Sequence, residues 1–124
     1  MNGPVLLVDD DHDLREELTR LCELEGYRVL PAAHGAEARA LLEAGEAPCV
    51  VVLDLMMPVM NGWELLAWLR AAGSPHRDLP VVLLSASTYA DATGQAFDVQ
   101  ATLAKPVPVP TLLQTLAQHC RRSA

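Results

Sequence analysis

The chain has 124 residues, of which 51% are hydrophobic and 4% aromatic, a composition that predicts one domain, residues 1–124, with an aliphatic core. Its formal net charge of −7 disfavours nucleic acid and anionic membranes as direct partners. No signal peptide is evident, and no stretch approaches the roughly 20 apolar residues of a bilayer span. We therefore expect a cytoplasmic protein, and Met1 directly before the first apolar run indicates a natural N-terminus.

The three cysteines, Cys22, Cys49 and Cys120, are odd in number and far apart in the sequence. They form no Cys-x-x-Cys motif and have no metal-ligand spacing. Each lies in an apolar or helical context. We therefore expect them to be small core residues in a reducing compartment.

The first part of the chain predicts a strand followed by a helix. The apolar run Val5–Val8 is typical of a short buried strand, and Asp11 or Asp13 can cap the helix that follows. Gly26 is placed to end that helix. Its apolar residues at helical spacing are Leu14, Leu18, Leu21 and Cys22.

A second strand is expected over Tyr27–Ala32. Pro31 cannot donate a hydrogen bond to a neighbouring strand, which places this strand at an edge of the sheet. A helix should follow over Ala36–Glu43, opened by Gly35 and stopped by Gly45. Its expected apolar face comprises Ala36, Ala40, Leu41 and Ala44.

The unbroken apolar run Val50–Leu53 directly precedes Asp54 and predicts a strand buried on both faces. A loop marked by Pro58 and Asn61-Gly62 then leads to a helix over Trp63–Ala72. The expected inward side chains of this helix are Leu65, Leu66 and Leu69, with Trp68 as a further candidate.

The last part of the chain predicts two more strand–helix units. A strand over Val81–Leu84 ends in Ser85, and a weakly helical segment follows over Thr88–Phe97. A short strand is expected over Ala101–Ala104, and Pro110 can occupy the first turn of a last helix. The apolar face of that helix comprises Leu112, Leu113, Leu116 and Cys120.

Strands that alternate with helices predict an α/β fold of the doubly wound (βα)5 type with a five-stranded parallel sheet. Right-handed crossovers leave few topologies, and an edge position for the second strand favours the order 2-1-3-4-5. In that order, ligands bind at the carboxyl ends of the strands, next to the first and third.

The unusual polar residues at strand ends all fall at this edge of the predicted sheet. Asp9 and Asp10 follow the first strand, and Asp54 follows the third. Ser85 ends the fourth strand, and Lys105 follows the fifth. Each residue alone has an ordinary explanation as a helix cap or a surface group, but five of them in one crevice predict a functional site.

Three neighbouring carboxylates repel one another, and Mg²⁺, which takes oxygen ligands, relieves that repulsion. A lysine can bind phosphate as a point charge. Together these groups predict a carboxylate nucleophile, Asp54, with Mg²⁺, Lys105 and Ser85 stabilising a transferring phosphoryl group. A deprotonated carboxylate needs no general base, and the scattered histidines are expected at the surface: His12, His34, His76 and His119.

Four motifs occur in order along the chain: Val8–Asp11 (VDDD), Asp54–Gly62 (DLMMPVMNG), Leu79–Ala86 (LPVVLLSA) and Lys105-Pro106. Together they resemble the receiver domains of two-component response regulators, the CheY-like family, over essentially the whole chain. The resemblance implies a flavodoxin-like fold. It also implies a phosphoprotein in a phosphorelay, which signals through an unidentified protein target and is not an enzyme beyond its own phosphotransfer and slow dephosphorylation.

The resemblance also assigns roles in the site. Asp54 would accept a phosphoryl group from phosphohistidine on a sensor histidine kinase or histidine phosphotransfer protein. Asp10 and Asp54 would be direct Mg²⁺ ligands, with Asp9 acting mainly through water and the backbone carbonyl of Met56 as a third protein ligand. Ser85 stands at the switch Ser/Thr position.

Three further positions are implied in the same way. Ala86 would be the small residue that leaves the site open. Lys105 would complete the site, followed by a cis peptide bond at Pro106. Met56 and Ser87 would flank the path of the water that hydrolyses the phosphoryl group. The apolar side chain of Met56 cannot orient that water. We therefore expect the phosphoryl group to persist for minutes or longer.

Two positions depart from the family pattern. The switch aromatic that usually stands three residues before the lysine is Thr102 here, and the aromatic usually found after Lys-Pro is Val107. A ring rotation cannot operate through a threonine. We therefore expect an unusual or weakened output switch.

Two other functions remain open from the sequence. One is an atypical receiver that acts as a phosphorylation-independent interaction module, which the missing aromatic at Thr102 favours. The other is a Mg²⁺-dependent phosphatase with an aspartyl nucleophile. Such an enzyme normally has an acid/base carboxylate two residues after the nucleophile, where this chain has Met56, and this argues against turnover.

Overall fold

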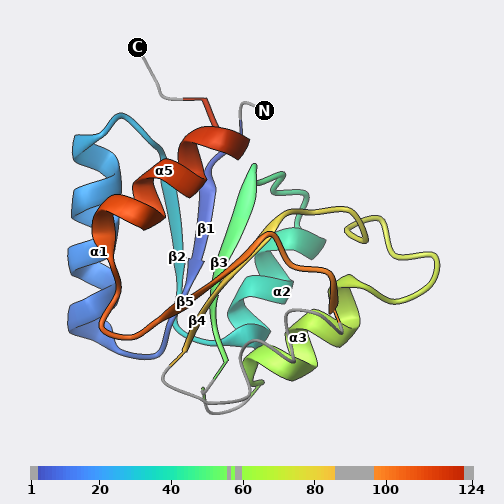
Figure 1. Ribbon diagram of the computed structural model, residues 1–124. Helices are drawn as coiled ribbons and strands as arrows, with labels where there is room; N and C mark the ends of the chain where they lie inside the picture. The colour runs from blue at the N-terminus through green and yellow to red at the C-terminus, as the bar shows by residue number, and fades with distance from the viewer. Residues whose placement is uncertain (1–2, 56, 58–59, 86–96, 122–124) are drawn as a thin grey trace.

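The computed structural model describes residues 3–55, 57, 60–85 and 97–121. A parallel sheet lies between two helical layers, with α1 and α5 over one face and α2 and α3 over the other (Figure 1). The sheet has five strands in the order β2-β1-β3-β4-β5, and every neighbouring pair is parallel. The predicted fold class and strand order are therefore confirmed.

The strands are β1 (Val5–Val8), β2 (Val29–Ala32), β3 (Val50–Asp54), β4 (Val81–Ser85) and β5 (Ala101–Ala104). The helices are α1 (His12–Leu24), α2 (Gly35–Glu43), α3 (Gly62–Leu69) and α5 (Val109–His119). The helix expected over Thr88–Phe97 falls almost entirely on residues 86–96, which lie outside the described part of the chain.

The apolar run of β3 fills two separate cores. Val51 and Leu53 join the cluster beneath α2 and α3, whereas Val50 and Val52 join the cluster beneath α1 and α5. All residues of β3 are buried. A strand covered on both faces has no solvent side, which is why its sequence shows no polar alternation.

The first helix forms as expected. The side chain of Asp11 caps α1 by accepting a hydrogen bond from the backbone N–H of Leu14 at 3.1 Å, and Leu18 and Cys22 are buried. Gly26 follows the C-cap with φ +93°. That left-handed conformation suits glycine, so the residue ends the helix without a steric penalty.

The predicted face of α2 is wrong in part: Leu41 packs half-buried against the core, but the alanines predicted beside it do not form the buried side. Its buried residues are Gly35, Ala38 and Leu42, while Ala40 and Ala44 are exposed. Alanines occur all around this helix, and so small a side chain gains little from burial on any one face. The larger side chains, Leu41 and Leu42, both contact the core, and Leu42 is the one fully buried.

Two element boundaries also differ from the sequence expectation. Strand β2 begins at Val29 rather than Tyr27, although it occupies the sheet edge and Pro31 is exposed there, as expected. Helix α3 ends at Leu69, three residues before its predicted end. The half-buried Trp68 beside it stacks against His76, with 5.3 Å between the ring centroids.

The expectation of three reduced cysteines is wrong for two of them. Cys49 and Cys120 form a disulfide across 71 residues of sequence, while Cys22 is a buried free thiol. All three belong to the core cluster beneath α1 and α5, so their predicted burial is confirmed. Their pairing depends on the meeting of the start of β3 with the end of α5, which spacing along the chain does not reveal.

None of the helices in the described ranges is long and apolar enough to cross a membrane.

Arg70, at the C-cap of α3, ties three backbone segments together. Its Nε donates to the carbonyl oxygen of Phe97 at 2.9 Å. Its Nη1 donates to the carbonyl oxygens of Arg77 at 3.0 Å and Leu79 at 2.8 Å. These bonds hold the segments that enter β4 and β5 against the end of α3.

Replacing this residue by Arg70→Met should lower the free energy of unfolding by about 2–3 kcal/mol, because several backbone carbonyls lose a charged donor. Arg70→Lys should restore only part of the loss, since an ammonium group lacks the planar fork. Denaturant unfolding measures both, with Arg20→Met on the exposed side of α1 as the control. Equal losses for Arg70→Met and Arg20→Met would contradict this account.

Candidate functional site

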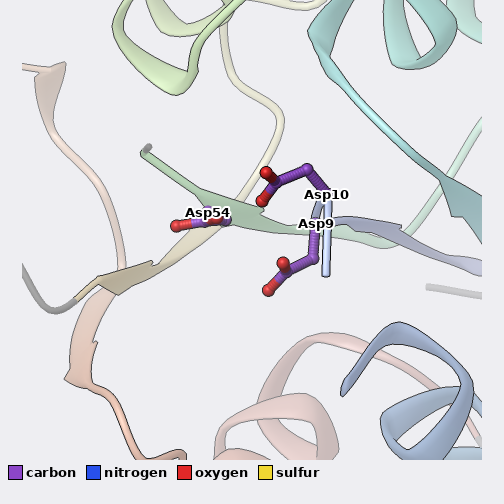
Figure 2. A group of neighbouring side chains, drawn as sticks. All are labelled: Asp9, Asp10 and Asp54. Carbon is purple, nitrogen blue, oxygen red and sulfur yellow. The ribbon is translucent and has the colours of Figure 1, made fainter. Parts of the chain in front are cut away.

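Three carboxylates meet at the carboxyl ends of β1 and β3. The register pairs Val8 with Leu53, so Asp9 and Asp54, which come next on the two strands, lie side by side. Asp9, Asp10 and Asp54 each offer one carboxylate oxygen, and these oxygens all lie within 4.8 Å of one another. Figure 2 shows Asp9 and Asp10 projecting from the end of β1 toward the side of Asp54.

The three carboxylates differ in exposure. Asp9 is 0% exposed and Asp54 is 3% exposed, while Asp10 is exposed to solvent. Two buried negative charges require compensation, because removing a carboxylate from water costs several kcal/mol. The exposed Asp10 is open to an ion or a ligand arriving from solution.

Lys105 provides that compensation. Its Nζ lies 3.0 Å from Oδ2 of Asp9 and 3.4 Å from Oδ2 of Asp54. Partial burial lowers the pKa of Lys105, but the hydrogen bond that its ammonium group donates to Asp9 and the charges of Asp54 and Asp9 outweigh that effect, so the pKa lies above its usual value. The side chain is therefore a full positive charge at neutral pH.

The two oxygens of Asp9 have different partners. Oδ1 accepts a hydrogen bond from the backbone N–H of Asp11 at 2.9 Å. Oδ2 is buried, and its partner among the described residues is the ammonium group of Lys105, 3.0 Å away. A carboxylate oxygen has two lone pairs, so Oδ2 can accept from a second partner beside Lys105.

The loop that carries the acidic residues is held by a residue that the sequence interpretation missed. Arg15, in the first turns of α1, donates from Nη1 to the backbone carbonyl of Asp9 at 2.7 Å. The available signal was its position just inside a helix capped by Asp11, where a long side chain can reach back to the preceding loop. Arg15 thus stabilises the loop through its backbone, not through a contact with the Asp9 carboxylate.

Ser85 ends β4 and is 2% exposed. The register places it opposite Ala104, and the carbonyl oxygen of Ser85 accepts a hydrogen bond from the backbone N–H of Lys105 at 3.2 Å. The expected cis peptide bond between Lys105 and Pro106 is present. Residues 85 and 105 are thus brought to the same edge as the carboxylates, as predicted.

Two expected site residues lie outside the described part of the chain. They are Met56, the expected carbonyl ligand, and Ala86, the expected small residue. The loop beyond β3 is described at residue 57 and again from residue 60, and Asn61 caps α3 in a reciprocal arrangement with Glu64. The backbone N–H of Gly62 donates to the carbonyl of Leu55 at 3.0 Å.

The site fits Mg²⁺ by its donor set. Three carboxylates supply only oxygen ligands, which this hard cation prefers. One of these oxygens, Oδ2 of Asp9, is buried and has the ammonium group of Lys105 as its partner among the described residues, so it can still accept from a second group. A single lysine offsets only part of the negative charge of three aspartates, so a further cation is favoured.

Comparison with known proteins agrees with this arrangement. Residues 5–117 match the family model of the response regulator receiver domain. The chain is 37% identical over 122 residues to response regulator MprA of Mycobacterium sp. (strain KMS), and the match covers 97% of this chain and 51% of that protein. The chain therefore belongs to the response regulator receiver domain family, and it is a receiver domain rather than a conventional enzyme.

Solved structures give the same result. A response regulator receiver protein from Pseudomonas putida superposes with a TM-score of 0.87 at 26% identity, covering 95% of this chain and 98% of that one. Response regulator TrrA from Thermotoga maritima, in complex with Mg²⁺-BeF, superposes with a TM-score of 0.79 at 28% identity, covering 95% and 98%. The chain spans about half the length of the curated relatives it matches.

The backbone approach at Gly62 generates a stability prediction. A Cβ at this position would lie 2.7 Å from the carbonyl oxygen of Asp54 and 2.6 Å from Cα of Leu55, so Gly62→Ala should lower the free energy of unfolding by about 1–3 kcal/mol. Gly73→Ala is the control, because φ is +80° there and no described atom lies within 4 Å of the new Cβ. It should cost only backbone strain, about 1 kcal/mol.

Denaturant unfolding distinguishes the two costs. If Gly62→Ala were no more destabilising than Gly73→Ala, the backbone near Asp54 could shift to admit the new Cβ. Close packing would then not explain why residue 62 is glycine.

Proposed function

We propose that this chain is the phosphoacceptor receiver of a two-component phosphorelay. Asp54 takes a phosphoryl group from phosphohistidine on a sensor histidine kinase or a histidine phosphotransfer protein. The observation that carries the proposal is the contact of Lys105 Nζ with both Asp9 and Asp54, beside a third carboxylate from Asp10. A cytoplasmic location and a single domain over residues 1–124 are parts of this proposal.

The transfer needs a nucleophile that is already ionised. A carboxylate oxygen of Asp54 attacks phosphorus, the bond from phosphorus to the imidazole nitrogen breaks, and the imidazole leaves with its electron pair. The product is an acyl phosphate on Asp54. Because a carboxylate carries no proton at neutral pH, the step requires no general base in the receiver.

Lys105 and Ser85 act on the phosphoryl oxygens. The ammonium group lies 3.4 Å from the Asp54 carboxylate, so a phosphoryl group attached there comes within reach of it. Fixed positive charge next to developing negative charge lowers the barrier without reorganisation during the reaction. The hydroxyl of Ser85, at the end of the neighbouring strand, serves as the switch donor to the same oxygens.

Mg²⁺ is the proposed cofactor. Asp10 and Asp54 would hold it directly, Asp9 through bound water, and the backbone carbonyl of Met56 would be a further ligand. When bound, the ion supplies positive charge to the phosphoryl oxygens and offsets repulsion among the carboxylates. The Mg²⁺-BeF complex of the similar protein TrrA supports this choice.

The output of the receiver is a protein–protein interaction with an unidentified target. Thr102 is half-buried on β5, opposite Leu83, and Val107 is half-buried against the cluster beneath α5. Neither side chain can carry a ring rotation, so we propose a weakened switch. The same observation favours a second candidate, an interaction module that works without phosphorylation.

Phosphorylation is tested by intact mass after incubation with Mg²⁺ and a small-molecule phosphodonor. We expect one phosphoryl adduct on the wild-type chain and none on Asp54→Asn, which keeps the shape of the side chain but is not a nucleophile. Asp13→Asn, on the exposed start of α1, is the matched control and should retain the adduct. The adduct should decay over minutes or longer once the donor is removed.

The absence of any adduct on the wild-type chain would favour the phosphorylation-independent module. Loss within a few seconds would contradict the expected lifetime but not the phosphoacceptor assignment.

Mg²⁺ binding is tested by isothermal titration of the unphosphorylated chain. Asp10→Asn should weaken binding by at least about tenfold, because it removes a charged oxygen ligand. The same substitution should raise the stability of the metal-free protein, since it relieves repulsion among three carboxylates. Asp13→Asn should change neither quantity. Unchanged affinity in Asp10→Asn would exclude the proposed metal position.

A further inference from the structure

The Cys49–Cys120 disulfide joins two elements at the end of the sheet remote from Asp54. Cys49 directly precedes β3, which runs from Val50 to Asp54, and Cys120 directly follows α5. In Figure 1 the end of α5 lies near the chain terminus where β1 begins, away from the carboxyl ends of the strands. The bond therefore connects the start of the central strand to the last helix.

Helix α5 packs against the sheet through an apolar face. Only Leu112 and Leu116 are buried within it, and Val109 and Leu113 pack against the same cluster while half-buried. Its N-cap is Pro108, which supplies no side-chain hydrogen bond, and its first turn carries no acidic residue. The first turn of α5 is therefore weakly fixed, and the covalent tether lies at the other end, at Cys120.

The surroundings suit the reduced state as well as the oxidised one. Sγ of Cys49 lies 3.5 Å from the carbonyl oxygen of Pro4, so a thiol at this position has an acceptor ready. Cys120 is surrounded by the apolar cluster, where a small thiol packs without leaving an unpaired strong donor. Opening the bond thus leaves no strong hydrogen-bond donor buried without a partner.

The third cysteine does not compete for the pair. Burial raises the pKa of Cys22 to about 11, with smaller contributions from the charges of Glu23 and Glu25. A thiol that stays protonated is a poor nucleophile. Cys49 and Cys120 therefore exchange with each other and with external reagents rather than with Cys22.

We propose that Cys49 and Cys120 form a thiol–disulfide redox site that is reduced by a dithiol, reoxidised by a small-molecule disulfide of the glutathione type, and tethers α5 only when oxidised. The proposal is independent of the phosphoacceptor function. The redox state of the cysteine pair would then control how firmly α5 is held, at the end of the sheet opposite Asp54, in addition to any effect of phosphorylation.

The exchange chemistry balances. One thiolate of the reductant attacks Sγ of Cys120, which is the more exposed of the pair at 7% against 1% for Cys49, and the Cys49 thiolate leaves and takes up a proton. The second thiol of the reductant then displaces the Cys120 thiolate, so the pair gains two electrons and two protons. In the reverse direction, one glutathione disulfide accepts them and leaves as two glutathione molecules.

The test uses the whole chain and two probes, dithiothreitol and glutathione disulfide, under native conditions. Alkylation after denaturation should count one thiol in the oxidised protein and three after dithiothreitol, and glutathione disulfide should restore the count of one. Amide hydrogen exchange in α5 should become faster by about tenfold or more on reduction, while exchange in α2 stays unchanged.

The matched variants are Cys22→Ala, which should keep the full cycle, and Cys120→Ser, which should show fast exchange in α5 under all conditions. The wild-type chain supplies the same comparison in its reduced form if Cys120→Ser does not fold. A disulfide that native dithiothreitol leaves intact would identify a purely structural bond and overturn the proposal. Equal exchange in α5 for the two redox states, or a mixed pairing that involves Cys22, would overturn it as well.

Discussion

The site depends on one cation placed between two buried carboxylates. Asp9 and Asp54 are almost completely removed from water, and two such charges side by side would oppose folding if nothing compensated them. Lys105 reaches both, and it does so because β4 lies between β3 and β5 and carries the end of β5 to the same edge. The parallel sheet thereby makes a charge balance possible among residues that are far apart in sequence. That balance remains incomplete, because Asp10 adds a third negative charge, and this incompleteness is what prepares the site for a further cation.

The fold could be predicted wherever a single physical signal dominated. The unbroken, β-branched apolar run Val50–Leu53 is typical of a strand covered on both faces, and it becomes the centre of the sheet. The face of α2 could not be predicted, because alanines such as Ala40 and Ala44 give almost no preference for one side. Leu42 is buried and the neighbouring Leu41 is half-buried against the same core, and this division between two leucines is settled only by packing in three dimensions.

The candidate site shows the same division. Asp9, Asp54 and Lys105 could be assigned from their positions at strand ends, since strand order alone brings those ends together. The contacts that could not be predicted from the sequence depend on the path of the backbone or on the docking of a helix. The disulfide of Cys49 with Cys120 requires α5 to cross back to the start of β3. Its two partners have no local signature, and they were wrongly expected to remain reduced.

Pro31 affects how readily two copies of the protein can associate through the edge of the sheet. It is exposed on β2, which forms one border of the sheet. A sheet border normally offers a row of N–H and C=O groups to which another chain can add a strand. Because proline has no N–H, that row is interrupted in the middle of a strand only four residues long. At high protein concentration, edge-to-edge pairing of β2 strands from two copies is therefore disfavoured.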